Sequence, residues 1–130
     1  MASGNQIRVL LVDDDVRILQ TLRSILKPYS NIVVVGEASD GDEAFTSVGT
    51  LHPAVVVMDI NMKKMDGITA ARLIKAQYPD VIVVGCSAHS KEYNIYAMQR
   101  VGAFKALLQK EDATKDLYPA IQTAMAGSVD

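Results

Sequence analysis

Acidic residues follow two of the apolar runs in this sequence, and their chemistry points to a cation site. Asp13, Asp14 and Asp15 come directly after the run VLLV, and Asp59 comes directly after VVVM. Carboxylates gathered at one place repel each other, so a cation must balance them. Mg²⁺ is the simplest candidate, because it binds through one or two carboxylates, a carbonyl and several waters. A carboxylate beside Mg²⁺ can also attack phosphorus and form an aspartyl phosphate.

The sequence offers a candidate for each part of such a site. The oxygen ligands for the ion would come from Asp13, Asp14, Asp59 and a main-chain carbonyl near Asn61. Phosphoryl transfer needs alignment and neutralisation of the peripheral oxygens, for which Ser87 and Lys110 supply a hydroxyl and a cation. The plainer alternative is that the acids only cap a helix and a strand end, a role we expect of Asp15. Taken alone, Ser87 would bond its own backbone and Lys110 would be a solvated surface lysine.

Five apolar runs of strand length alternate with segments of helical period. The expected strands are residues 7–12, 32–38, 54–58, 81–87 and, more weakly, 106–108. Runs nearly continuous in Val, Ile and Leu are typical of parallel strands that are covered on both faces. Capping residues indicate helix starts after Asp40, Ser90 and Asp112. The alternation predicts an α/β fold, an open parallel sheet with helices on both faces, whose ligands lie at the carboxyl ends of the strands.

The composition limits the remaining possibilities. With 130 residues the chain has the size of one domain, and 49% apolar and 22% charged residues exclude a disordered or fibrous protein. The net charge of −2 disfavours nucleic-acid binding by the chain itself. A single cysteine, Cys86, allows no internal disulfide, and no stretch resembles a signal peptide or a membrane span. We therefore expect a cytoplasmic protein with no membrane association.

Four motifs then occur in a recognisable order. They are VLLVDDD (9–15), VVVMDINM followed by MDG (55–67), VVGCSAH (83–89) and VGAFKALLQK (101–110). Together they resemble the response regulator receiver domain of two-component signalling, a CheY-like domain, over residues 6–126. The variant is similar to receivers that precede a LuxR-type helix-turn-helix. The resemblance leaves no second domain in this chain.

The resemblance implies a flavodoxin-like, doubly wound sheet of five parallel strands in the order 2-1-3-4-5. By position, Asp59 would be the phosphoacceptor, and Asp13 and Asp14 would bind the metal. Asn61 would add its carbonyl, and Ser87 would be the switch hydroxyl. The residues expected to flank the phosphate site are Asn61, Ala88 and His89. The implied cofactor is Mg²⁺ and the implied partner a sensor histidine kinase. A homodimer on phosphorylation is possible, and DNA would be reached only through an effector domain not in this chain.

Two departures from the family pattern affect the site. Lys63 stands where the family has a proline four residues after the acceptor, so the loop lacks that fixed φ. Counted from Gly102, the slot of the family's lysine falls on Gln109, and Lys110 follows one residue later. A one-residue slip reverses the side-chain direction, so Lys110 reaches the site only if the strand is bulged or the loop longer. Lys105 is a more distant candidate for this role.

The output face is expected on the fourth helix, residues 91–101. Tyr93, Tyr96 and Arg100 lie at i, i+3 and i+7 and so share one face, where tyrosines are frequent at interfaces. The alternative is that they merely cover the sheet edge. The family's aromatic near the lysine is replaced by Ala106 or Leu107, and Phe104 could take over its part.

Three other classes of function remain open. A haloacid dehalogenase-type phosphatase also uses an aspartate after an apolar strand, but it has a second acid two residues later, where this chain has Asn61. A flavodoxin-like cofactor binder is disfavoured, because acids rather than a phosphate-binding loop follow the first strand. A receiver-like interaction domain that works without phosphorylation is supported only by the displaced lysine.

Overall fold

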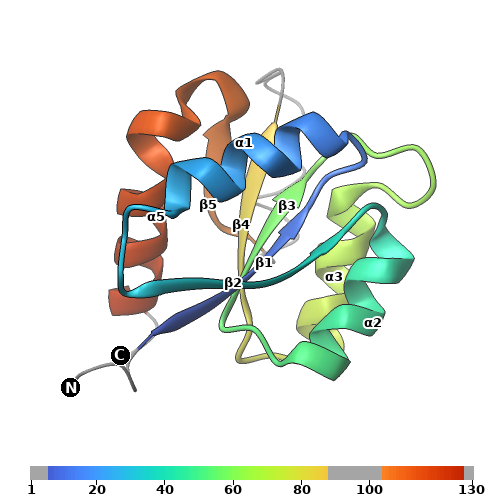
Figure 1. Ribbon diagram of the computed structural model, residues 1–130. Helices are drawn as coiled ribbons and strands as arrows, with labels where there is room; N and C mark the ends of the chain where they lie inside the picture. Colours follow the sequence, from blue (N-terminus) through green and yellow to red (C-terminus); the bar gives the residue numbers. More distant parts are fainter. Residues whose placement is uncertain (1–5, 88–103, 128–130) are drawn as a thin grey trace.

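The computed structural model describes residues 6–87 and 104–127 and contains one parallel sheet between two layers of helices (Figure 1). The strands are β1 (Ile7–Val12), β2 (Ile32–Ala38), β3 (Val55–Asp59), β4 (Ile82–Ser87) and β5 (Phe104–Gln109). The helices are α1 (Val16–Leu26), α2 (Gly41–Leu51), α3 (Gly67–Gln77) and α5 (Ala113–Gly127), with a 3₁₀ turn at Lys110–Asp112 before α5. The strand order is β2-β1-β3-β4-β5 and all pairings are parallel, which confirms the predicted fold.

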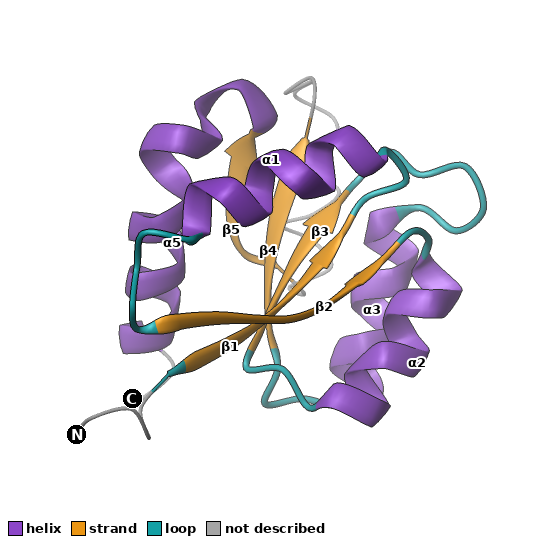
Figure 2. Cartoon of the chain, in the orientation of Figure 1, coloured by secondary structure: helices purple, strands orange, loops and turns teal. Residues whose placement is uncertain are grey.

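Each face of the sheet has its own core. Figure 2 shows α1 and α5 on one side of the sheet and α2 and α3 on the other. Along β1, Val9 and Leu11 pack towards α1 and α5, whereas Leu10 and Val12 pack towards α2 and α3. All four side chains are at most 1% exposed. Because both faces are buried, the strand has no polar alternation, which explains its continuous apolar sequence.

Aspartates begin the first three helices. Asp15, Asp40 and Asp66 are the N-caps of α1, α2 and α3, and each side chain accepts a backbone N–H of the first turn. These bonds satisfy donors that a helix start leaves without a partner. The cap expected at Asp15 is therefore confirmed, and the other two acids of the DDD run are left for the sheet edge. The helix start expected after Ser90 lies outside the described residues.

The strand ends differ little from the prediction, except in β5. We expected a strand at 106–108, and the structure has one from Phe104 to Gln109. The strand lies at the sheet edge and is mostly half-buried, so its sequence carries a weaker apolar signal than those of the central strands. None of the helices in the described part of the chain is long and apolar enough to cross a membrane.

Candidate functional site

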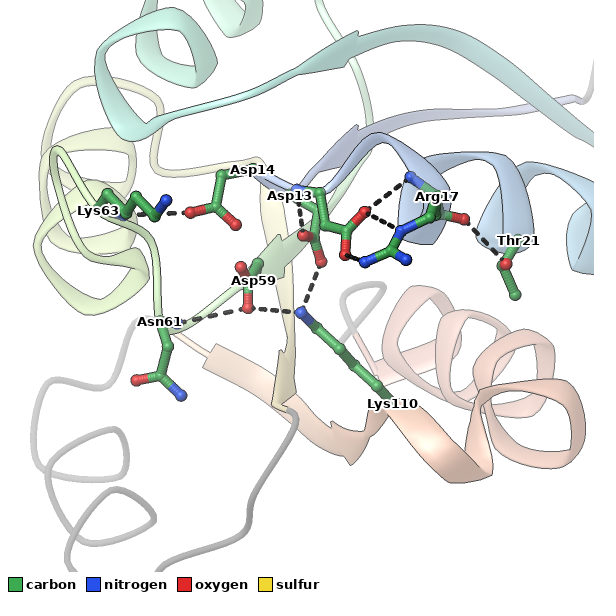
Figure 3. Close-up of polar contacts among 9 residues, drawn as sticks. Asp13, Asp14, Arg17, Thr21, Asp59, Asn61, Lys63 and Lys110 are labelled. Carbon is green, nitrogen blue, oxygen red and sulfur yellow. Dashed lines mark hydrogen bonds and ion pairs between the residues drawn. The ribbon is translucent and has the colours of Figure 1, made fainter.

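The acidic cluster forms where the central strands β1 and β3 end. Val12 pairs with Met58, so the next residues, Asp13 and Asp59, emerge side by side. Both are almost fully buried, at 1% and 2% exposed, and Asp14 lies beside them on the exposed side. One carboxylate oxygen from each of these three acids lies within 4.8 Å of the other two. Figure 3 shows the three carboxylates converging at this edge of the sheet.

Lys110 provides the cation of this cluster. Its Nζ lies 2.7 Å from Asp13 Oδ2 and 3.0 Å from Asp59 Oδ1, and its side chain is only 17% exposed. The side chain reaches across from the start of the 3₁₀ turn towards both carboxylates (Figure 3). The structure thus brings together residues from the ends of β1, β3 and β5.

A bulge in β5 accounts for the position of Lys110. Val83 pairs with Phe104, but the next residue, Val84, pairs with Ala106, so Lys105 is an extra residue in β5. The bulge shifts the rest of the strand by one position, and Gln109 is its last residue. Lys110 therefore leaves the strand and enters the turn beside the acids. Of the two ways in which Lys110 could reach the site, a bulged strand or a longer loop, the structure contains the bulge.

Lys105 points elsewhere. It is exposed near the beginning of β5, whereas the acids lie at the carboxyl ends of the strands. Its side chain comes close to Gly127, at the end of α5. It is therefore not part of the acidic cluster.

Burial and charge make the ionisation of Asp59 unfavourable. Burial, reinforced by the negative charge of Asp13, raises the pKa of Asp59 to about 6, although Lys110 and the Asn61 backbone N–H act in the opposite direction. Burial also disfavours the charged form of Lys110, but the two carboxylates outweigh it and raise the pKa of this ammonium above its usual value. One lysine therefore only partly balances the two buried acids.

The donor atoms of this cluster fit a hard divalent cation. Asp59 Oδ2 is buried and has no hydrogen-bond partner among the residues described. Asp13 Oδ2 makes no well-aligned hydrogen bond within the same residues, so its short contact with Lys110 is best described as an ion pair. Asp13 Oδ1 is held in place by the Asp15 backbone N–H at 2.9 Å. A buried carboxylate oxygen without a partner, close to two further carboxylates, is the ligand type that Mg²⁺ prefers.

The other predicted residues lie as follows. The backbone N–H of Asn61 donates to Asp59 Oδ1 at 3.4 Å, and the residue is otherwise exposed. Ser87 is the last residue of β4, 2% exposed, and pairs with Gln109 on the strand that leads to Lys110. Phe104 is half-buried against the core on the α2 and α3 side. The remaining predicted positions lie outside the described residues, and they are Ala88, His89, Tyr93, Tyr96 and Arg100.

Two backbone features at the site were not anticipated from the sequence. The backbone N–H of Lys63 donates to Asp14 Oδ2 at 3.3 Å, a bond that a proline could not make. Gly67, at the start of α3, leaves room for the backbone of β3, because a Cβ there would collide with the Asp59 carbonyl. The lack of proline at position 63 could have indicated the free N–H in the sequence. The glycine of the Asp66-Gly67 pair could have indicated the close backbone approach.

Comparison with known proteins agrees with this geometry. The sequence pattern of the response regulator receiver domain matches residues 9–122. The transcriptional regulatory protein DegU of Brevibacillus brevis is 34% identical over 123 residues, which are 95% of this chain and 52% of DegU. The transcriptional regulatory protein LiaR of Bacillus subtilis is 34% identical over 121 residues, which are 93% of this chain and 57% of LiaR. The chain thus spans about half the length of these relatives.

The fold is also shared with a solved structure. The response regulator domain of Thermotoga maritima CheB superposes with a TM-score of 0.86 at 30% identity, covering 93% of this chain and 97% of that domain. The residues that match the receiver-domain pattern, 9–122, include Asp13, Asp14, Asp59 and Lys110. This chain belongs to the response regulator receiver domain family of two-component signalling.

Proposed function

We propose that this receiver domain accepts a phosphoryl group on Asp59 and thereby switches an output. The observation that carries the proposal is the buried Asp59 carboxylate, which has one oxygen on Lys110 at 3.0 Å and the other without a hydrogen-bond partner in the described part of the chain. One of these two oxygens would bind the ion, and the other would form the bond to phosphorus.

The proposed metal site consists of Asp13, Asp14 and Asp59, with the main-chain carbonyl of Asn61. Mg²⁺ bound there would neutralise the carboxylates and the oxygens of an incoming phosphoryl group. Lys110 places a second positive charge beside Asp59. With a pKa of about 6, Asp59 is mostly ionised at pH 7 even without the ion, as a nucleophile must be.

In the proposed transfer, an Asp59 oxygen attacks the phosphorus of a phosphohistidine. A P–O bond forms, the P–N bond breaks, and the imidazole of the histidine kinase leaves. With a small phosphodonor such as acetyl phosphate, acetate leaves instead. Self-dephosphorylation follows when water attacks the same phosphorus: a new P–O bond forms, the bond between Asp59 and phosphorus breaks, and inorganic phosphate leaves the restored carboxylate. The chemistry is confined to this one residue, which suits a signalling module more than an enzyme with a separate substrate.

The proposed signal starts at Ser87. Phosphorylation adds about −1.5 to −2 units of charge and new acceptor oxygens beside this buried residue. A hydrogen bond from its hydroxyl to the phosphoryl group would draw the end of β4 towards the site. The change would then bias the predicted output face, which would comprise the helix expected at residues 91–101, β5 and α5, through Tyr93, Tyr96, Arg100 and Phe104. One or two charge-assisted hydrogen bonds can supply the few kcal/mol that such a population shift needs.

The proposed output is control of transcription. DegU and LiaR are transcriptional regulatory proteins, and the segments that match this chain are 52% and 57% of their lengths. By this analogy, a sensor histidine kinase would supply the phosphoryl group. The switched face would act on a DNA-binding effector domain, and phosphorylation would also favour a homodimer. The interaction-only alternative rested on the displaced lysine, and it loses that support because Lys110 contacts both buried acids.

The test is phosphorylation with a small donor. The protein is incubated with Mg²⁺ and acetyl phosphate, and intact mass is measured for wild type, Asp59→Asn and the control Asp80→Asn, which alters an exposed acid. We expect a single phosphoryl adduct in wild type and in the control, and none in Asp59→Asn. An adduct that persists in Asp59→Asn would place the acceptor elsewhere. Mg²⁺ binding without any adduct would refute the proposed chemistry.

A further inference from the structure

The loop between β3 and α3 is fixed to the body of the domain beside the acidic cluster. Met62 in this loop is buried, at 7% exposed. Met65 packs so closely against the start of α2 that a Cβ on Gly41 would lie 2.8 Å from its side chain. The loop ends where Gly67 lies against the backbone of Asp59. A loop held at these points presents its backbone groups in a defined direction.

One of those backbone groups is aimed at Asp14. The N–H of Lys63 donates to Asp14 Oδ2 at 3.3 Å, and Figure 3 shows this contact on the side of the cluster away from Lys110. It is the only hydrogen bond of the Asp14 side chain within the described residues. Asp14 is also the exposed member of the three acids, whereas Asp13 and Asp59 are held by burial and by Lys110.

We propose that the backbone N–H of Lys63 is a positioning group that holds Asp14 ready to bind Mg²⁺. The inference rests on the proposed function, since it assigns a part to the same metal site. An exposed carboxylate without this restraint would sample other rotamers, and binding the ion would then cost the entropy of fixing it. With the restraint, one carboxylate oxygen of Asp14 already lies within 4.8 Å of oxygens of Asp13 and Asp59. Receivers with proline at this position cannot form this bond, because proline has no N–H.

The side chain of Lys63 acts in the opposite direction from its backbone. Lys63 and Asp14 line the same open cavity next to the cluster. An ammonium group there repels a divalent cation, although exposure to solvent weakens the effect. Removing the side chain alone is therefore expected to leave Mg²⁺ binding as tight as in wild type or slightly tighter. Removing the N–H is expected to weaken it.

Two substitutions at position 63 separate these effects. Lys63→Ala removes the charge and keeps the N–H, whereas Lys63→Pro removes both. Mg²⁺ affinity is measured by isothermal titration calorimetry, and folding is checked by thermal unfolding in EDTA. We expect the Kd of Lys63→Pro to be about threefold to tenfold higher than that of Lys63→Ala, as for the loss of one hydrogen bond. If proline prevents folding, an ester in place of the Lys63 backbone amide removes the N–H donor without fixing φ. We expect the same increase in Kd for this ester variant.

The same pair in an Asp14→Ala background tests whether the effect passes through Asp14. There, Lys63→Ala and Lys63→Pro are expected to bind Mg²⁺ equally, because the acceptor of the hydrogen bond is gone. When Asp14 is intact, Lys63→Ala and Lys63→Pro should be phosphorylated by acetyl phosphate at different rates at low Mg²⁺. The two rates should converge when Mg²⁺ saturates the site.

The outcomes separate this inference from the proposed function. Equal Kd values for Lys63→Ala and Lys63→Pro, in a wild type that binds Mg²⁺ and is phosphorylated, would overturn the role of the N–H alone. A Kd difference that persists without Asp14 would overturn it as well, because the effect would then come from the loop. If wild type neither binds Mg²⁺ nor accepts a phosphoryl group, the proposed function fails and the inference with it.

Discussion

Asp59→Asn is expected to stabilise the folded protein when Mg²⁺ is absent. Burial and the charge of Asp13 raise the pKa of Asp59 from 3.8 to about 6. Each pKa unit corresponds to about 1.4 kcal/mol, so ionised Asp59 costs the folded state up to about 3 kcal/mol at pH 7. Asparagine has nearly the same shape and no charge, but it weakens the contact with Lys110. We therefore expect the free energy of unfolding to rise by about 1 to 3 kcal/mol.

The increase in the free energy of unfolding caused by Asp59→Asn should become smaller as the pH falls. Between about pH 4 and pH 6 the folded protein keeps the proton on Asp59, whereas the unfolded chain has lost it. This group therefore makes wild type less stable as the pH rises through that window. Below about pH 4 both states are protonated, and the advantage of Asp59→Asn should disappear.

Urea denaturation in EDTA, followed by far-UV circular dichroism, measures the effect. Wild type, Asp59→Asn and the exposed-acid control Asp80→Asn are compared at about pH 4 and about pH 7, so that the titration of all other carboxylates cancels. Added Mg²⁺ should stabilise wild type more than Asp59→Asn, because a ligand that binds only the folded state adds to its stability. The reasoning would be refuted if Asp59→Asn were no more stable than wild type at pH 7. It would also be refuted if the stability difference between Asp59→Asn and wild type were the same at both pH values.

Three further substitutions and one labelling experiment test the site and its surroundings. Lys110→Ala should destabilise the protein in EDTA by on the order of 3 kcal/mol, because two buried carboxylates lose their shared cation, and it should impair signalling. Lys105→Ala, at an exposed position, should change stability by less than about 0.5 kcal/mol in the same denaturation assay and signal normally. Gly67→Ala should cost about 1 to 3 kcal/mol by urea denaturation, since its Cβ collides with the backbone of the acceptor strand, and unchanged stability would contradict this close approach. Burial raises the pKa of Cys86 to about 11, so iodoacetamide at pH 8 should label it only after denaturation, as measured by mass spectrometry.

The sheet and the position of its acids could be predicted from the sequence, because both depend on local patterns. A strand buried on both faces is apolar at nearly every buried position, and this makes β1, β3 and β4 visible as nearly continuous apolar runs. Parallel strands end at a common edge, so acids placed directly after β1 and at the end of β3 were expected to meet there. The edge strand β5 is half-buried, and its apolar signal was too short to give its full length.

The position of Lys110 depended on the tertiary structure. From the sequence, the lysine lay one residue past the family position, and its side chain could have pointed to either face. The extra residue at Lys105 resolves this, but a bulge is defined by pairing with β4, about twenty residues earlier in the chain.

The sequence alone therefore determined which residues could do the chemistry and on which edge of the sheet they lie. Only the fold decided that Lys110 contacts two buried acids, that Asp59 is desolvated enough to shift its pKa, and that a backbone N–H holds Asp14. The physical reason is that apolar periodicity reports the burial of each segment separately. Hydrogen bonds, ion pairs and desolvation depend instead on distances between segments that are far apart in the chain.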